Sequence, residues 1–406
     1  MKLTFLKIVI AFFIGIAITS CGRDSHPAVT PADSAYAFAV KATPDGLWGL
    51  ADANGNLIVD YRFESVPTAV IEDVFSAQSD SGIVVYRLPE ATAIFSELRA
   101  AGCPADGIMP ICRPESPIEV ADTDGNILFE LSDIDGHNFT ACHAYFTDGV
   151  LIARDFTTNR WGAISSNGYL IIEPIYDYIT PFSRNRALAI RHDDDGNPLL
   201  CVIDSNGSEI EAIRGDFDII SPRFSFGLCV VVDNTTGIKS LIDRSGNLSP
   251  LPIQNIRVEA IVDDGIAYSD STHHSGILDL DGKPVSPASY FSVSSLPGIK
   301  HICALRADST DILSADGKLL VTMPGNLRLI PLPSRDIYLA INDIQSSVTL
   351  LDKNLAPIPD ISFAKAELIT CLSDIILSDR ADDHRNFNPY HGEPQPEWMK
   401  PDSEDE

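Results

Sequence analysis

Short runs of apolar residues alternate along most of this chain with turns that carry Asp, Asn or Ser before a Gly. Residues 118–125 are Ile-Glu-Val-Ala-Asp-Thr-Asp-Gly, and residues 200–207 are Leu-Cys-Val-Ile-Asp-Ser-Asn-Gly. Apolar runs rich in β-branched residues are typical of strands, and an Asn-Gly or Asp-Gly turn joins two of them as a hairpin. Gly adopts the positive φ that such a turn needs. The pattern therefore predicts an all-β protein.

The hairpin turns recur at a nearly constant interval. Successive turns lie 35 to 43 residues apart after a first interval of 70 residues, at Gly55, Gly125, Gly168, Gly207, Gly246, Gly282, Gly317 and Asn354. A third strand-like run precedes most hairpins, and a fourth follows the better preserved ones. Four short strands in about 40 residues are the strand number and repeat length of a propeller blade. One blade cannot cover its own apolar faces, so the blades are expected to stack around an axis.

Eight hairpins predict a β-propeller of about eight four-stranded blades over residues 35–378. Seven blades is the alternative, if the degenerate unit at Val348 closes the ring with N-terminal strands. Residues 374–378 are placed like the leading strand of a further unit and would supply part of that closure. A β-sandwich with extra strands or an open solenoid is the alternative architecture. The regular period argues against a sandwich, and a closed ring leaves no long exposed strand edge.

The long first interval holds an insertion at about residues 83–116. Within it, residues 91–101 contain good helix formers, and Ile94, Phe95 and Leu98 have the spacing of one helix face. We therefore expect one short helix here. Insertions in repeat proteins gather on one face, often the binding face, and a decoration without a partner is the alternative.

Two repeats have a more specific sequence. Residues 159–177 are Asn-Arg-Trp-Gly-Ala-Ile-Ser-Ser-Asn-Gly-Tyr-Leu-Ile-Ile-Glu-Pro-Ile-Tyr-Asp, and residues 46–63 follow a similar pattern. They resemble the WG-repeat β-propeller family, whose unit has a Trp-Gly pair, a turn with Gly, two aliphatic residues, Pro and an aromatic-acidic pair. The residues that carry this resemblance are Trp48, Gly49, Gly55, Trp161, Gly162 and Gly168. We expect both tryptophans to pack within blades, and we take a role as sugar-stacking platforms as the less favoured alternative.

The N-terminus has the pattern of an export signal. Lys2 and Lys7 precede an apolar stretch at residues 8–18, which is too short to cross a bilayer of about 30 Å. The sequence Ile-Thr-Ser-Cys that ends at Cys21 resembles a lipobox, the motif of lipoprotein signal peptidase. The resemblance implies loss of residues 1–20 and acylation of Cys21, for example with palmitate. A secretory signal with an incidental cysteine, or a retained transmembrane helix, is the alternative.

Composition indicates what lies on either side of the folded domain. Residues 21–34 are expected to form a flexible tether, and residues 379–406, with nine acids and three bases, a disordered acidic tail. The formal charge of −28 repels nucleic acid and anionic lipid headgroups. We therefore exclude DNA and RNA as partners. We expect the lipid on Cys21 to contact a membrane of the bacterial envelope, with the outer membrane as the favoured one.

Candidate binding chemistry is sparse. Cys103 and Cys112 flank a short loop and are candidates for a disulfide in an exported protein, with free thiols as the alternative. The acidic turns supply two carboxylates each, fewer than calcium-binding loops usually supply. The His273-His274 pair and residues 192–195 (His-Asp-Asp-Asp) are interpreted as loop surface. We predict no metal and no cofactor.

The chain has no Gly-x-Ser-x-Gly, P-loop or His-Glu-x-x-His motif, and we predict no catalytic residue. The favoured hypothesis is a non-enzymatic lipoprotein whose propeller binds an unknown envelope protein or glycan. The alternative is a hydrolase or lyase that acts on an envelope polysaccharide at an axial site. A purely structural decoration is the third. A deep axial pocket with carboxylates, His or Arg would favour the enzyme.

Overall fold

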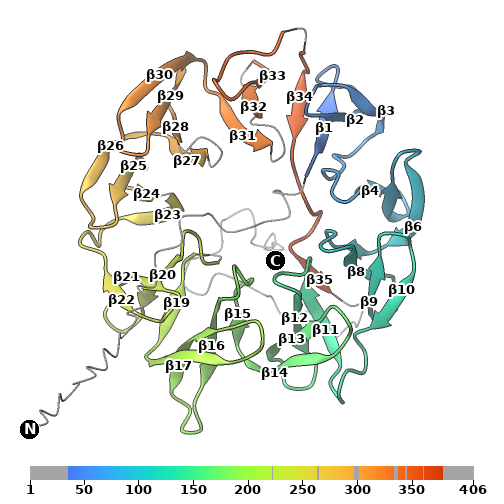
Figure 1. Cartoon of the computed structure of the whole chain (residues 1–406), viewed down its shortest axis with the longest axis vertical. Coiled ribbons are helices and arrows are strands. Elements are labelled where there is room, and N and C mark those ends of the chain that lie inside the picture. The colour runs from blue at the N-terminus through green and yellow to red at the C-terminus, as the bar shows by residue number, and fades with distance from the viewer. Residues whose placement is uncertain are drawn as a thin grey trace, which may run out of the picture.

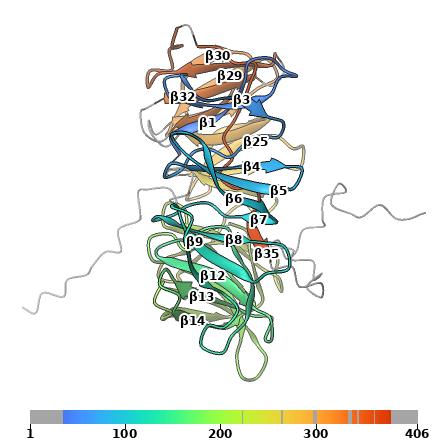
Figure 2. The same ribbon diagram turned by 90° about the vertical axis from the view of Figure 1, so that its right-hand side faces the viewer.

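The computed structural model describes residues 35–377 except for 222, 263–264, 297–300, 333–336, 343–344 and 360. These residues form strands and no helix, and so include no helix that could span a membrane. Nine small antiparallel sheets follow one another in a ring (Figure 1). The ring is a disc when it is viewed from its side (Figure 2). The predicted signal, Cys21, the tether and the acidic tail lie outside the described residues.

We number the sheets as blades 1 to 9 around the ring and give the strands of each from the rim inward. Blade 1 is β3 (Leu57–Phe63), β2 (Trp48–Asp52), β1 (Ala37–Lys41) and β34 (Lys365–Glu367); blade 2 is β6 (Thr92–Leu98), β5 (Gly82–Arg87) and β4 (Val74–Ser79); blade 3 is β10 (Ile127–Glu130), β9 (Ile118–Asp122), β8 (Ile108–Cys112) and β7 (Ala100–Ala101). Blade 4 is β14 (Leu170–Tyr176), β13 (Trp161–Ser165), β12 (Val150–Asp155), β11 (Phe139–His143) and β35 (Ile375–Leu377); blade 5 is β18 (Glu209–Arg214), β17 (Pro198–Ile203), β16 (Ala187–His192) and β15 (Tyr178–Ile179).

The remaining blades repeat this order. Blade 6 is β22 (Leu248–Pro250), β21 (Lys239–Asp243), β20 (Leu228–Asp233) and β19 (Phe217–Ile219); blade 7 is β26 (Pro284–Tyr290), β25 (Ser275–Asp279), β24 (Gly265–Ser269) and β23 (Arg257–Val262). Blade 8 is β30 (Leu319–Pro324), β29 (Ser309–Ser314), β28 (His301–Leu305) and β27 (Ser292–Leu296), and blade 9 is β33 (Ser347–Leu351), β32 (Ile337–Asn342) and β31 (Arg328–Leu332).

The prediction of an all-β propeller is confirmed, but the predicted number of blades is wrong, because the ring has nine sheets rather than eight or seven. The additional sheet is blade 2, whose strands β5 and β6 overlap the insertion predicted at about residues 83–116, while β4 precedes it. The helix expected over residues 91–101 is also wrong, since most of that segment is β6.

A β-bulge explains why β6 has the apolar spacing of a helix. Leu98 pairs with Ile83 and Phe95 pairs with Val85, so three steps along β6 match two steps along β5. Glu97 lies in the bulge with a φ of 57°. An extra residue brings side chains three positions apart onto one face of a strand. Phe95 and Leu98 are both buried there.

The middle strands of a blade are buried on both faces because the neighbouring blades pack against them. β12 is buried at every position, whereas β18 at the rim is exposed at nearly all of them. The hydrophobic clusters therefore lie between sheets, as where Leu188 and Val202 of blade 5 pack with Val231 and Ile242 of blade 6. This burial accounts for the unbroken apolar runs of the sequence.

Residues 365–377, which we call the C-terminal strap, complete two blades. β34 pairs with β1, Val40 opposite Ala366, and supplies the innermost strand of blade 1. The chain then passes along the inner side of the ring to blade 4, where β35 pairs with β11 (Figure 1). The segment expected to help close the ring thus adds a fifth strand to blade 4, and β34 makes the closure at blade 1.

Candidate functional site

The tryptophans of the repeat signature are packing residues. Trp161 is 2% exposed and Trp48 is 6% exposed. The Trp161 ring lies edge-on to the ring of His143, with 5.4 Å between the centroids, inside blade 4. Trp48 packs in a cluster with Phe63 and Val70. Neither indole presents a face on which a sugar could stack.

The glycines of the signature have steric roles. A Cβ on Gly162 would lie 2.3 Å from the carbonyl oxygen of Ile172, and one on Gly49 would lie 2.7 Å from that of Val59. Such distances are shorter than a carbon and an oxygen tolerate, so these two positions let neighbouring strands approach closely. Gly55 and Gly168 sit in the hairpin turns with positive φ (78° and 80°), a region that glycine enters at little cost.

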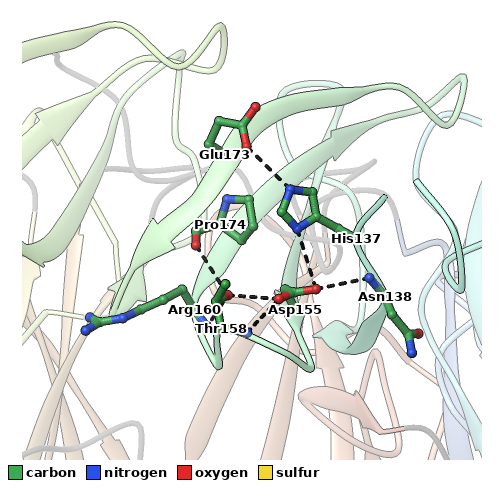
Figure 3. Close-up of polar contacts among 7 residues, drawn as sticks. All are labelled: His137, Asn138, Asp155, Thr158, Arg160, Glu173 and Pro174. Carbon is green, nitrogen blue, oxygen red and sulfur yellow. Dashed lines mark hydrogen bonds and ion pairs between the residues drawn. The ribbon is translucent and has the colours of Figure 1, made fainter. Parts of the chain in front are cut away.

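A polar network holds the β12–β13 hairpin of the same blade (Figure 3). The buried Asp155 carboxylate accepts hydrogen bonds from the backbone of Asn138 (3.0 Å) and from the backbone and hydroxyl of Thr158 (2.7 and 2.9 Å). His137 lies 3.6 Å from Asp155 and 3.5 Å from Glu173. Burial raises the pKa of Asp155, but these hydrogen bonds outweigh it and the pKa is lowered. The carboxylate is fully engaged, which suits a structural role.

The aromatic-acidic pair of the signature joins blade 4 to blade 5. The Tyr176 hydroxyl donates to Glu209 at 3.0 Å, and Glu209 also accepts two hydrogen bonds from Arg191, at 2.6 and 2.8 Å. Asp177 lies 2.9 Å from the Nδ1 atom of His192. His192, predicted to be loop surface, thus belongs to this contact between blades.

The acidic turns bind their own backbones. In the turn after β9, the Asp122 Oδ1 atom accepts hydrogen bonds from the N–H groups of Asp124 (3.0 Å) and Asn126 (2.8 Å). The same arrangement recurs at Asp52, Asp193, Asp204, Asp243 and Asp352. Within the described part of the chain, no group of three or more His, Cys, Asp or Glu residues is arranged to hold a metal ion.

The two adjacent histidines of blade 7 have separate surroundings. The His274 Nδ1 atom lies 2.9 Å from the Thr272 hydroxyl. His273 lines a polar cleft of about 320 Å³ between blades 6 and 7, together with Lys239, Gln254 and Arg257 among others. The histidines therefore share no ligand position.

Cys103 and Cys112 are both buried, and both are free thiols. The register of blade 3 pairs Cys112 with Ala100, and the N–H of Gly102 continues the ladder to Pro110. Cys103 therefore lies three positions from the partner of Cys112, about 10 Å along the strand and on the opposite face. A disulfide needs a Cα separation below about 7 Å. The structure does not bring these two cysteines together.

Four arginines gather on one face of blades 5 and 6. In an antiparallel blade the first and third connections lie at the same end. Arg184 and Arg186 belong to the first connection of blade 5, Arg223 to that of blade 6, and Arg244 to the third connection of blade 6. The Arg244 guanidinium donates to the carbonyl oxygen of Arg184, which confirms that the two blades share this surface. We call Arg184, Arg186, Arg223 and Arg244 the arginine face.

Two of these arginines have buried donor atoms without a partner. The Nε atom of Arg186 and the Nη1 atom of Arg223 are buried and have no hydrogen-bond partner among the described residues. The Arg223 guanidinium reaches past blade 5 to lie 6.0 Å from the ring centroid of Tyr145, on the β11–β12 connection of blade 4. Leaving a charged donor buried and unpaired costs free energy, so such atoms indicate a place for an acceptor.

The histidine beside Arg223 adds no charge to this surface. Burial, and then the charge of Arg223, lower the pKa of the half-buried His143 to about 4, so its imidazole is neutral at pH 7. Burial also raises the pKa of Tyr145, although Arg223 opposes that shift. The carboxylate of Asp148, on the same face, accepts the N–H of Asn185 at 2.7 Å. The arrangement offers hydrogen-bond donors to an anion in an otherwise acidic protein.

No local sequence pattern marks the arginine face. Its members come from different repeats, and each lies in a connection of ordinary composition. The one available signal is spacing, because Arg186 and Arg223 are 37 residues apart, within the 35 to 43 residue period of the hairpin turns. Equivalent positions of neighbouring repeats lie side by side in a ring.

Comparison with known proteins identifies the repeat. Residues 161–190 match the family model described as WG containing repeat, and no curated protein matches the chain. Among solved structures, the computationally designed Ika8 protein is 13% identical, with a TM-score of 0.37, over 79% of this chain and 96% of that one. BamB from Moraxella catarrhalis is 12% identical, with a TM-score of 0.36, over 67% and 92%. A WG-containing repeat of this nine-bladed β-propeller therefore comprises β13 and β14 of blade 4 together with β15 and most of β16 of blade 5.

Proposed function

We propose that this protein is a non-enzymatic binding module of the bacterial cell envelope, and that its arginine face binds an anionic group of an envelope glycan or protein. The observation that carries the proposal is the pair of buried, unpartnered donors on Arg186 and Arg223. A guanidinium matches carboxylate and phosphate oxygens in geometry and stays charged at any physiological pH.

Binding suits this surface better than hydrolysis does. Enzymes that cleave glycosidic bonds typically place two carboxyl groups on either side of the scissile bond. The arginine face instead offers cations beside Tyr145 and a neutral His143. In a chain of charge −28, a local group of cations also gives an acidic ligand a defined place to bind.

Replacing Arg223 by Met should weaken binding of a carboxylate-bearing polymer at least about tenfold, because one charge-assisted contact contributes about 1.5–3 kcal/mol. Arg186→Met should act in the same direction. Titration calorimetry with polygalacturonate, and with polyglutamate as the protein-like ligand, measures the effect. Arg214→Met is the matched control, since Arg214 is an exposed arginine that pairs with Asp193 at the other end of blade 5. The proposal would be refuted if wild type and Arg223→Met bound the acidic polymers with equal affinity and wild type bound neutral dextran equally well.

The membrane location is a separate part of the proposal and rests on the sequence around Cys21. Replacing Cys21 by Ala removes the acylated side chain, and we expect the folded domain to appear in the soluble fraction after cell lysis. A lipid anchor contributes about 0.8 kcal/mol for each buried methylene, which this acidic surface cannot replace. Fractionation with immunoblotting gives the measurement, and a variant that stays with the membrane would contradict a lipid-only anchor.

A further inference from the structure

The C-terminal strap passes directly over Cys103. The N–H of Cys103 donates to the carbonyl oxygen of Ala144 at 2.8 Å, and the N–H of Ala144 donates to that of Asp374 at 3.1 Å. Before that point, the carbonyl oxygen of Ile369 accepts the N–H of Ala69 at 2.7 Å. Two backbone contacts thus hold the strap on either side of Cys371.

Cys371 meets Cys103 between these two contacts. Both cysteines pack in one small apolar cluster with Ala35, Ala69 and Ile71. Cys103 is fully buried, whereas Cys371 is half-buried and so within reach of a reagent. From these contacts we propose that Cys103 and Cys371 form a disulfide that fixes the strap to blade 3 in an oxidising compartment.

The reaction balances as a thiol–disulfide exchange with a disulfide oxidant, such as a dithiol oxidoreductase or oxidised glutathione. The Cys371 thiolate attacks the oxidant, and one thiol of the oxidant leaves. The Cys103 thiolate then displaces the second, so that one Sγ–Sγ bond forms while two protons and two electrons pass to the oxidant. The hydrogen bond to Cys103, and then burial, raise the pKa of Cys371, so we expect the bridge to form as the strap docks rather than afterwards.

The other buried cysteines lie in different surroundings. The Cys112 thiol donates to the carbonyl oxygen of Leu377 at 3.0 Å, and Cys112 packs with Cys142 in the cluster between blades 3 and 4. Cys229 is buried near the start of β20 in blade 6, away from the strap. These residues serve as internal comparisons for the bridge.

Refolding the chain in a glutathione redox buffer, trapping free thiols by alkylation and mapping peptides without reduction tests the proposal. We expect the peptides of Cys103 and Cys371 to be recovered joined, and those of Cys112, Cys142 and Cys229 to be alkylated. Recovery of Cys103 and Cys371 alkylated, or of Cys103 joined to Cys112, would overturn the proposal.

A stability cycle gives a second readout that does not depend on peptide recovery. Under oxidising conditions Cys371→Ser should lower the thermal midpoint by at least about 5 °C, and adding Cys103→Ser should change it little further. Reductant should lower the wild-type midpoint and leave that of Cys371→Ser unchanged. Cys229→Ser is the control, and reductant should lower the thermal midpoint of this variant as it does that of the wild type. Additive effects of the two serines, with no response to reductant in the wild type, would mean that no bridge forms.

Discussion

A chain that ends at Phe363 is expected to unfold at a much lower denaturant concentration than the full chain. Its free energy of unfolding should be lower by at least about 4 kcal/mol. It loses β34 and β35, and with them two antiparallel pairings and the buried side chains of Ala366 and Ile376. Each lost hydrogen bond costs about 0.5–1.5 kcal/mol, and fully burying an Ile contributes about 1.5–3 kcal/mol. Urea unfolding followed by circular dichroism measures the difference.

A chain that ends at Leu377 is the control for this truncation, since it keeps the whole strap. The Phe363 chain should also elute partly as aggregate in size exclusion, because β1 and β11 then present unpaired inner edges. If the two truncated chains unfold at the same midpoint, the strap does not close the ring.

Trp161→Ala is expected to lower the free energy of unfolding by about 3–5 kcal/mol, the range for removing a buried aromatic side chain. Trp161 is 2% exposed and packs in the cluster that includes Ile152, Tyr176 and Ile179, where blade 4 meets blade 5. The cavity would lie between two blades, so both should loosen. Equilibrium unfolding in urea measures the loss.

Tyr169→Ala is the matched control for Trp161→Ala. Tyr169 belongs to the same hairpin, but 69% of its surface is exposed. Its removal should change the free energy of unfolding by less than about 0.5 kcal/mol. A similar cost for both variants would contradict the assignment of Trp161 to packing and would reopen a role in binding.

The propeller could be predicted because each repeat contains a turn whose residue types are recognisable from the local sequence. Each counted hairpin has an Asp or Ser that starts the turn and a Gly or Asn near its end, which fixes both strand boundaries and period. Blade 2 was missed because residues 88–91, Leu-Pro-Glu-Ala, join β5 to β6 without that signal. The bulge at Glu97 then gave β6 the apolar spacing of a helix.

The candidate site could not be predicted, because it depends on which loops meet. Arg223 contacts Tyr145 across a separation of 78 residues (223 minus 145), and nothing in either loop indicates the other. Only the antiparallel order of the blades places their first connections at one end. The contact of Cys103 with Cys371 depends in the same way on the path of the strap. Sequence proximity instead suggests the pairing of Cys103 with Cys112.

The strap also sets the order in which the protein can be completed. Ala39 in blade 1 pairs with Glu367, and these residues are 328 positions apart (367 minus 39). Pairings of such long sequence separation slow folding, because the entropy of closing the loop is lost before the contacts form. During synthesis, blades 1 and 4 stay incomplete until β34 and β35 have been made. A chain of this design is therefore expected to depend on chaperones that shield unfinished sheets until its last residues emerge.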